Sequence, residues 1–193
     1  MITQFIQSIN WVDVALAVLF VRMVFISVST GFITELFKLL GVFLALIVSL
    51  HYFSHLALLT AKKITLPWAS WQFLIFMGIA VIVYLSIRFL REGTLMLFKV
   101  ETTNDGFDKY GAGILSVGRS IILCSMLVFG LLLMSHTYIR QLTVKSQGYK
   151  IFAYAGPNTY RFVYDHVIGK LFEKEKFNEA VFAVVAANGS NPK

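Results

Sequence analysis

Four long apolar stretches, separated by short polar connections, dominate the hydrophobic pattern of this chain. They cover residues 12–32, 36–59, 68–90 and 111–134. Each is near or above the ~20 residues that a helix needs to cross the apolar layer of a bilayer. None alternates with the period of two that marks a barrel strand, so the spanning segments must be helices. The pattern predicts an all-α, polytopic membrane protein with four transmembrane helices.

The polar and mixed segments divide the chain into three parts. Residues 1–10 are expected to form an interfacial lead-in, residues 11–135 the four-helix transmembrane unit, and residues 136–193 an extramembrane tail. The lead-in has no basic region and no small-residue cleavage site, so the first helix is expected to be retained. The connection 88–109 mixes apolar and charged residues, which predicts a segment that lies on the membrane surface.

The tail is expected to carry C-terminal amphipathic helices. Within residues 157–174, four apolar residues recur at helical spacing and predict one apolar side. They are Tyr160, Val163, Val167 and Leu171. Residues 177–187 are apolar but too short to cross a bilayer. Such helices are expected to cover the membrane surface or a partner subunit.

Composition and charge support lipid as the surrounding solvent. Of the 193 residues, 58% are hydrophobic and 14% are charged, far from the composition of a soluble domain. The net charge of +7 lies at the ends of apolar runs and in the tail. It forms no basic groove lined by aromatic residues, so we expect a lipid bilayer and not a nucleic acid as its partner. The single cysteine, Cys124, is expected to be a small packing residue.

Ionisable residues inside the spans are the candidate functional residues, because a charge near the centre of a membrane helix costs about 2.5–3.5 kcal/mol. Arg22 lies ~13 Å from the Gly31 end of the first helix, and Arg119 lies ~12 Å into the fourth helix from the same side. Glu35 is within reach of both arginines. We therefore predict an intramembrane charge network. Its members are Arg22, Glu35, Lys38, Asp108 and Arg119.

Two interpretations of this network stay open. It can be a pair that orients the helices, or part of a route for an anion or a proton. In both, Arg22 is expected to face the bundle interior, because Ala15, Arg22 and Ser29 are spaced by seven residues.

Small residues predict close helix packing. Gly31 centres the short connection between the first two helices, which predicts a tight antiparallel hairpin. On the fourth helix, small residues recur every four positions up to Cys124 and let another helix approach. The predicted packing residues are Gly31, Gly111, Ala112, Ser116, Gly118 and Ser120.

No constellation in the sequence predicts catalysis, a metal or a cofactor. His51 and His55 are one helical turn apart, but no Cys, Asp or Glu ligand lies near them in sequence, so we expect solvated histidines. The chain has no Ser-His-Asp order, nucleotide-binding glycine loop or metalloprotease motif, which predicts a protein that is not an enzyme. Asp105 and Asp108 are interpreted as a helix cap.

Basic residues do not predict the membrane orientation, because five lie on each side. One side has Lys62, Lys63, Arg140, Lys145 and Lys150, and the other has Lys38, Arg88, Arg91, Lys99 and Lys109.

The order of motifs over residues 11–135 resembles the colicin V production protein (CvpA) family. The first block runs through Trp11-Val12-Asp13, Gly31-Phe32, Glu35 and His51-Tyr52, and the second through Asp108-Lys109, small residues and Arg119. The chain departs from the family at Thr30 and Thr34, where basic residues are usual, and at Arg22, which is extra.

The resemblance implies a bacterial inner-membrane protein associated with toxin (colicin V) production or export and with envelope homeostasis. It also implies a cytoplasmic hairpin side and periplasmic termini. We expect a non-enzymatic accessory protein that forms a homo-oligomer and contacts secretion or envelope components. The alternative is a small oligomeric channel or transporter with a polar path lined by the intramembrane charges.

Overall fold

In a computed structural model of the chain, the described residues form helices and no β-strand, which confirms the all-α prediction for this part of the chain. The structure describes residues 10–27, 31–61, 67–98, 106–134, 136–172 and 175–189. The long helices are α2 (Trp11–Ser27), α3 (Phe32–Thr60), α4 (Trp68–Phe98) and α5 (Gly106–Leu133). The tail contains α6 (Thr137–Lys145), α7 (Gln147–Phe152), α8 (Ala155–Val163), the π-helix η2 (Tyr164–Ile168), α9 (Gly169–Leu171) and α10 (Ala180–Gly189).

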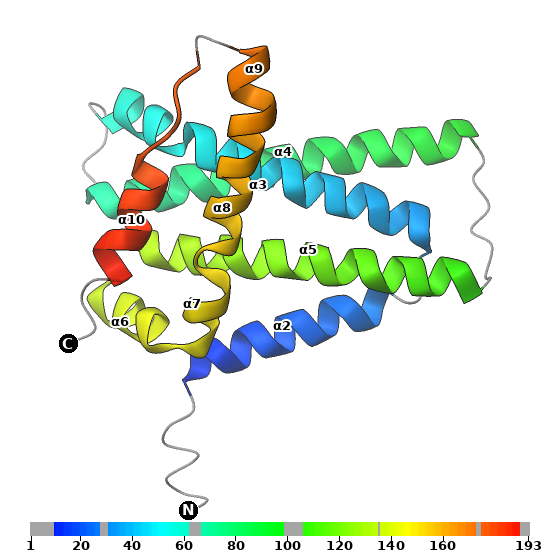
Figure 1. The fold of residues 1–193 in the computed structure, drawn as a ribbon, viewed down its shortest axis with the longest axis horizontal. Helices are drawn as coiled ribbons and strands as arrows, with labels where there is room; N and C mark the ends of the chain where they lie inside the picture. Colours follow the sequence, from blue (N-terminus) through cyan, green and yellow to red (C-terminus); the bar gives the residue numbers. More distant parts are fainter. Residues whose placement is uncertain are drawn as a thin grey trace, which may run out of the picture.

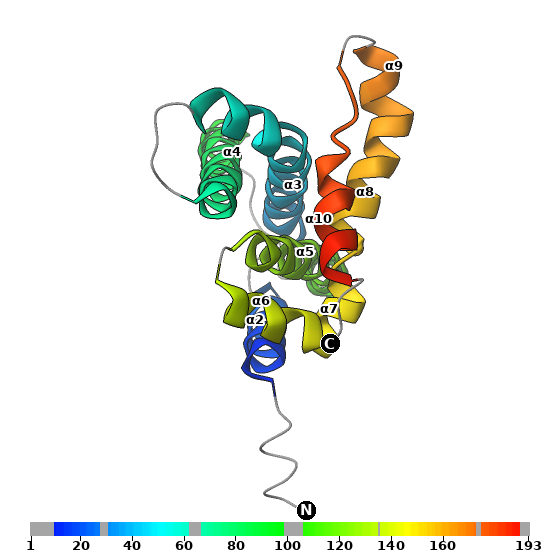
Figure 2. The ribbon, with the colours of Figure 1, turned by 90° about the vertical axis from the view of Figure 1, so that its left-hand side faces the viewer.

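The four long helices run side by side in alternating directions (Figure 1). The start of α2 and the ends of α3 and α5 therefore lie at one end of the bundle. The helices α7, α8 and α9 form a column that runs across the long helices on one side of the bundle, with α10 beside it (Figures 1 and 2). The tail is thus packed against the bundle through α6, α7, α8 and α10.

Three described helices, and not four, are long and apolar enough to cross a membrane. They are Phe32–Thr60, Trp68–Thr94 and Asp108–Leu133. The expected first span, residues 12–32, is wrong in length: α2 has 17 residues. Such a helix measures about 25 Å, which is less than the ~30 Å thickness of the apolar layer. Residues 28–30 lie outside the described part.

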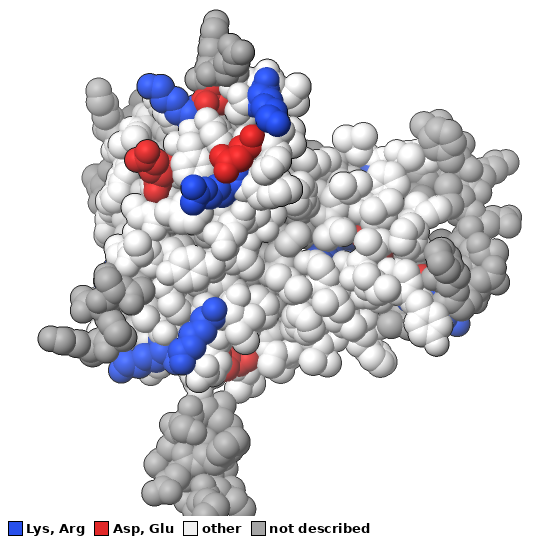
Figure 3. All heavy atoms as spheres, viewed as in Figure 1, with Lys and Arg blue, Asp and Glu red and all other residues white. Residues whose placement is uncertain are grey.

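Apolar side chains cover the outer faces of α2 and α4. Val18, Val21 and Phe25 of α2 are exposed, as are Ile82 and Phe89 of α4. Exposed apolar surface of this extent is unfavourable in water and favourable in lipid. In the space-filling view, charged atoms gather over α8 and α9 and near α6, while the rest of this face is mostly uncharged (Figure 3). The outer surface of the long helices is therefore suited to acyl chains.

The core lies where α3 passes between α4 and α5. The fully buried ring of Phe53 packs edge-on against Phe76 and Phe129, with ring centroids 6.2 and 5.7 Å apart. Such pairs add about 0.5–1.5 kcal/mol to the free energy of burial. At Gly41, a Cβ atom would lie 3.2 Å from Cγ2 of Ile87. The small residue lets α3 and α4 approach closely.

The predicted surface connection 88–109 is wrong for its first half. Helix α4 continues without interruption to Phe98, and α5 begins at Gly106. Arg88 Nε lies 3.0 Å from Glu92 Oε1, one turn further along, which supports the continued helix. Residues 106–109 of the expected connection belong to α5, and residues 99–105 lie outside the described part.

Two hydrogen bonds and a glycine attach the tail helix α7 to α2. Asp13 accepts hydrogen bonds from the backbone N–H groups of Gln147 and Gly148, at 3.1 and 2.7 Å, and so caps α7. A Cβ atom at Gly148 would overlap Cδ1 of Leu16. Glycine at this position therefore lets α7 lie close to α2 without a shift of the Leu16 side chain.

The predicted apolar stripe of the tail is interrupted. Tyr160 is fully buried, but Val167 and Leu171 are 46% and 70% exposed. The π-helix η2 contains Val167 and has a wider turn than an α-helix, which rotates Val167 and the residues after it off the stripe. Ile168, and not Val167, packs against the core as a result. The expected amphipathic helix is thus not confirmed in that form.

Candidate functional site

The turn before α3 is held to the start of α5 by a carboxylate. Gly31 has φ 76° and ψ 154°, a conformation that favours glycine. It is the N-cap residue of α3 and has no side chain to accept hydrogen bonds from the free N–H groups there. Asp108 of α5 supplies the acceptor: the Phe32 N–H donates to Asp108 Oδ1 at 2.8 Å. The sequence predicted a cap from Asp105 and Asp108 in the turn before the fourth helix. Asp108 instead lies within α5 and caps α3, and Asp105 lies outside the described residues.

The same turn is tightened by Gly111. A Cβ atom at this position would lie 2.6 Å from Cδ2 of Phe32, so any side chain would displace the ring. The first turn of α3 and the second turn of α5 can therefore pack only because residue 111 is glycine.

Glu35 is fully buried one turn into α3, and two cations lie against it. Arg119 Nη1 is 2.7 Å from Glu35 Oε2, and Lys38 Nζ donates to Glu35 Oε1 at 2.6 Å. Arg119 is itself buried, and its Nη2 also donates to the carbonyl of Met23 at 3.4 Å. One guanidinium therefore connects α2, α3 and α5. We call Glu35, Lys38 and Arg119 the charge cluster.

Burial makes the charge cluster sensitive to the loss of a member. At an effective dielectric constant near 20, two charges 4 Å apart attract by about 4 kcal/mol. Removing one partner of a buried pair costs about 3–5 kcal/mol, because the other charge is left uncompensated. Since Glu35 and Arg119 are closed off from the surface, the cluster is suited to orienting three helices and forms no open conduit in this conformation.

Arg22 does not join the charge cluster. It lies with Ala15 on the exposed face of α2, while Val12, Leu16 and Ser27 form the buried face. No described residue forms a hydrogen bond or ion pair with Arg22. The expectation that this arginine points into the bundle is therefore wrong for this structure. Ala15 and Arg22 share one face as expected, but packing directs that face outward, and Ser29 lies outside the described residues.

The small residues of α5 pack within the same chain. Ala112, Ser116 and Ser120 are fully buried, and Ser27 Oγ donates to the Ala112 carbonyl at 3.3 Å. Gly118 is less constrained, since a Cβ atom there would make an ordinary contact at 3.9 Å with a leucine of α3. This surface of α5 is thus occupied by α2 and α3 and is not available to a second copy.

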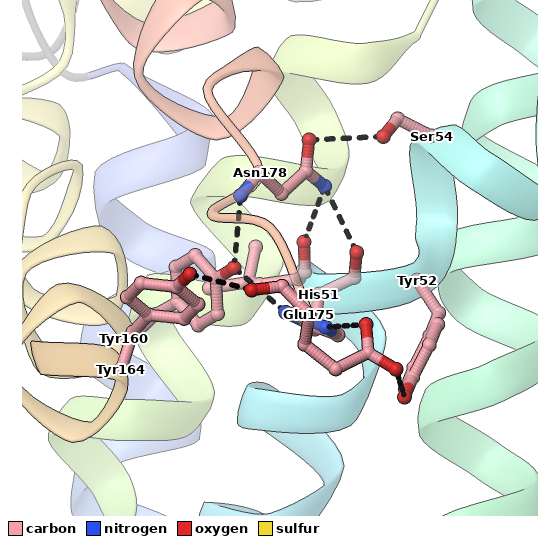
Figure 4. Close-up of polar contacts among 8 residues, drawn as sticks. His51, Tyr52, Ser54, Tyr160, Tyr164, Glu175 and Asn178 are labelled. Carbon is pink, nitrogen blue, oxygen red and sulfur yellow. Dashed lines mark hydrogen bonds and ion pairs between the residues drawn. The ribbon is translucent and has the colours of Figure 1, made fainter. Parts of the chain in front are cut away.

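A second polar cluster, which we call the tail latch, joins α3 to the tail (Figure 4). His51 is buried, with Nδ1 2.9 Å from Tyr160 Oη and Nε2 3.1 Å from Glu175 Oε2. The Tyr160 oxygen accepts from the backbone N–H of Asn178 at 3.1 Å, which leaves its proton for His51 Nδ1. On this assignment Nε2 carries the imidazole proton and donates to Glu175.

Asn178 completes the tail latch. Its Nδ2 donates to the carbonyls of Leu50 and His51 at 2.7 and 3.2 Å, and Ser54 Oγ donates to its Oδ1 at 2.9 Å. Burial raises the pKa of Tyr160 to about 12, so its hydroxyl stays protonated. The latch closes the tail over the middle of α3 with every polar group of Asn178 in use.

Sequence reasoning missed the tail latch. It treated His51 and His55 as a pair, but His55 is exposed and only His51 is buried. The partner Tyr160 is 109 positions away, so no local spacing reveals the contact. The available signal was the position of His51-Tyr52 in the family pattern.

The comparisons with known proteins give one match. The sequence matches the family described as Colicin V production protein over residues 12–157, more than half of the chain. The expected limit of the resemblance at residue 135 was therefore too short, because the matched region includes α6, α7 and the start of α8. No curated protein and no solved structure matches the chain.

Proposed function

Because this chain belongs to the colicin V production protein family, we propose that it is a non-enzymatic accessory protein of the bacterial inner membrane. In this role it supports colicin V production or export, or the maintenance of the envelope. Three helices able to cross a membrane support a multi-pass protein. The start of α2 and the end of α5 lie at the same end of the bundle (Figure 1), although α2 is short, and the proposal places this end, with both termini, in the periplasm. It also includes contacts with secretion or envelope components.

The closed charge cluster is the observation that carries this proposal. Charged residues that line a transport route need access to water. Glu35 and Arg119 are instead shielded and paired with each other. The family residues Gly31-Phe32 and Asp108 lie beside them and fix the same corner of the bundle. A rigid corner that holds three helices, with a tail docked across them, supports a scaffold for partner proteins.

Complementation tests the proposal. A bacterial strain that lacks its own family member and carries the colicin V genes receives the wild-type chain, Arg119→Ala or Arg140→Gln, the last altering an exposed arginine of α6. Secreted colicin V is measured together with the amount of each protein in the membrane. Wild type and Arg140→Gln are expected to restore secretion, and Arg119→Ala is not. Equal restoration by all three, at equal membrane amounts, would contradict the proposal.

Arg22 favours a second candidate, an oligomeric channel or transporter. This arginine is exposed among Val18, Val21 and Phe25. A charge facing acyl chains costs about 2.5–3.5 kcal/mol on insertion scales, and a polar path between two copies would remove that cost. Solute flux through liposomes containing the purified protein, lost on Arg22→Gln, would favour the channel. Secretion components that co-purify without any flux would favour the accessory role.

A further inference from the structure

We propose that the outer face of α3 and α4 binds an anionic phospholipid, with an acyl chain in an apolar groove and the phosphate beside a group of basic side chains. This site lies on another side of α3 from the tail latch, and it does not depend on the proposed function. Two adjoining features carry the inference.

The first feature is a groove of about 210 Å³ formed by α3, α4 and α5, with a lining made only of apolar side chains and the ring of Tyr84. Val42, Ala45 and Ala80 are buried in it, whereas Val81 and Leu85 are 49% and 40% exposed. The groove therefore opens on the surface that faces lipid. A narrow groove with this apolar lining suits a slender acyl chain.

The second feature is a narrow cleft that adjoins the groove at Tyr84, which lines both. Lys38, Arg88 and Arg91 line this cleft. At about 10 Å³, the cleft has room for little more than a water molecule, so a phosphate would lie across its mouth. The basic side chains are long enough to reach the headgroup layer while their stems remain in the apolar layer.

Among the described residues, the cations at the cleft outnumber the carboxylates that pair with them. Glu92 is the carboxylate for both arginines, with oxygen–nitrogen distances of 3.0 Å to Arg88 and 3.5 Å to Arg91. Lys38 in turn shares its carboxylate, Glu35, with Arg119. Two carboxylates thus face four cations.

One buried donor at the cleft also points to a ligand. The Nε of Arg91 is buried and has no hydrogen-bond partner among the described residues. A phosphate oxygen would supply both the missing acceptor and the missing charge. Basic pockets between membrane helices are known to suit anionic headgroups.

The spacing of the two features fits one lipid molecule. Arg88 at the cleft and Met77 at the far end of the groove are about 16 Å apart along α4. The headgroup and the apolar chain of a single lipid can therefore engage both features together.

Native mass spectrometry of the purified full chain in detergent tests the headgroup. The protein is titrated with phosphatidylglycerol or phosphatidylcholine, and bound lipid is counted. Wild type is expected to bind phosphatidylglycerol at least fivefold more tightly than phosphatidylcholine. Arg88→Gln/Arg91→Gln is expected to lose that preference, while Arg140→Gln/Lys145→Gln, which removes the same charge from exposed residues of α6, keeps it. A preference that survives in the first variant, or disappears equally in both, would overturn the site.

Two further measurements test the groove and the source of the phosphate. Leu85→Trp places an indole at the rim, and Leu74→Trp places one on an exposed part of α4 outside the groove. The fluorescence of wild type, which has three native tryptophans, is subtracted from both. The quencher is a lipid with brominated chains, present at low content in phosphatidylcholine vesicles. Brominated phosphatidylglycerol should quench the indole at residue 85 more than brominated phosphatidylcholine does. The two brominated lipids should quench the indole at residue 74 equally. Equal quenching at residue 85 refutes the site even if the arginine variant fails to fold. Displacement of the lipid by millimolar glycerol phosphate would assign the basic residues to a soluble phosphate ester instead.

Discussion

The first turn of α3 receives its cap from a carboxylate 76 positions away in the sequence. Gly31 allows the backbone to turn but has no side chain, and Asp108 provides the acceptor that a serine or aspartate at the cap would provide locally. Three residues of the family pattern, Gly31, Phe32 and Asp108, thus meet at one point. Their physical task is to fix the direction in which α3 leaves the turn.

Replacement of Asp108 tests this cap. Asp108→Ala removes the acceptor for the Phe32 N–H and is expected to lower the free energy of unfolding by about 0.5–2 kcal/mol. Asp108→Asn retains a side-chain oxygen, so its free energy of unfolding should fall clearly less than that of Asp108→Ala. Thermal unfolding in detergent measures both. If the two variants are equally stable, the carboxylate does not act as a cap.

Replacement of Glu35 tests the charge cluster. Glu35→Gln leaves the buried Arg119 without its carboxylate and is expected to cost about 3–5 kcal/mol. Glu35→Gln/Arg119→Met should cost less than the sum of the single changes, since the buried guanidinium is removed together with its carboxylate. Chemical denaturation in detergent gives these values. Asp165→Asn, in an exposed pair with Arg161, is the control and should cost less than about 1 kcal/mol. Additive losses would show that Glu35 and Arg119 are not coupled.

The position of Glu35 beside Arg119 could be predicted, whereas the exclusion of Arg22 could not. The depth of a residue in a membrane helix follows from its distance in sequence to the helix end, and this placed Glu35 and Arg119 at matching levels. The direction of a side chain around the helix axis depends on which neighbours pack, and α2 packs through Val12 and Leu16. No property of Arg22 itself contains that information.

At the scale of single elements, the tail differs most from its sequence pattern. The stripe that starts at Tyr160 predicts a regular helix, but η2 changes the register within it. A π-turn leaves no periodic signal, because it arises where tertiary contacts on both sides prefer different faces of the chain. Here the tail latch holds Tyr160 inward and the core holds Ile168 inward.

Removal of the Tyr160 hydroxyl tests the tail latch. Tyr160→Phe takes the acceptor from the Asn178 N–H and the donor from His51, and is expected to cost about 1–3 kcal/mol. Hydrogen exchange in detergent should become faster in α8 and α10 and stay unchanged in α4. Tyr164→Phe, which removes a single hydrogen bond to the Glu175 carbonyl, should have a smaller effect. Unchanged exchange in α10 after Tyr160→Phe would argue against the latch.

The same hydroxyl predicts a pH dependence of stability. Burial raises the pKa of Tyr160 from 10 to about 12, so the folded state holds this proton more tightly than the unfolded state. Below pH 10 both states are protonated and the group has no effect. Between pH 10 and 12 only the unfolded state releases the proton, so stability falls. The unfolding temperature of wild type should therefore drop more steeply than that of Tyr160→Phe above pH 10, and parallel curves would disprove the coupling.

At the scale of the whole molecule, the antiparallel order of the four long helices follows from the hydrophobic pattern, but the docked tail does not. Apolar runs reveal each helix because the signal is local. The attachment of α7 to α2 depends instead on Asp13 and Gly148, which are 135 positions apart. The length of the first apolar run also gave a wrong prediction, because α2 is shorter than a membrane span. Its inner face packs on the bundle, while Arg22 stays on the exposed face.

The exposed arginine predicts self-association through α2. If two copies meet there, Val18→Cys, an exposed position one turn from Arg22 that leaves the arginine in place, should form disulfide-linked dimers in native membranes under mild oxidation. The native Cys124 is buried and does not compete. Phe89→Cys, on the outer face of α4, is the matched exposed position and should remain monomeric. Dimers are detected by non-reducing electrophoresis. Monomers from both variants would place the homo-oligomer contact elsewhere or remove it.

The column of α7, α8 and α9 lies across the bundle, and this limits how deeply the protein can enter a bilayer. Gly156 of α8 meets Ser125 of α5, and Ser125 is about 26 Å along that helix from Asp108. An apolar layer is about 30 Å thick. The column crosses α5 at nearly this distance from Asp108, and Arg161 and Asp165 are exposed on it. It would therefore lie at the headgroup layer on the far side of the membrane. The thickness of membrane that this chain accepts would then be fixed by where its tail is fastened.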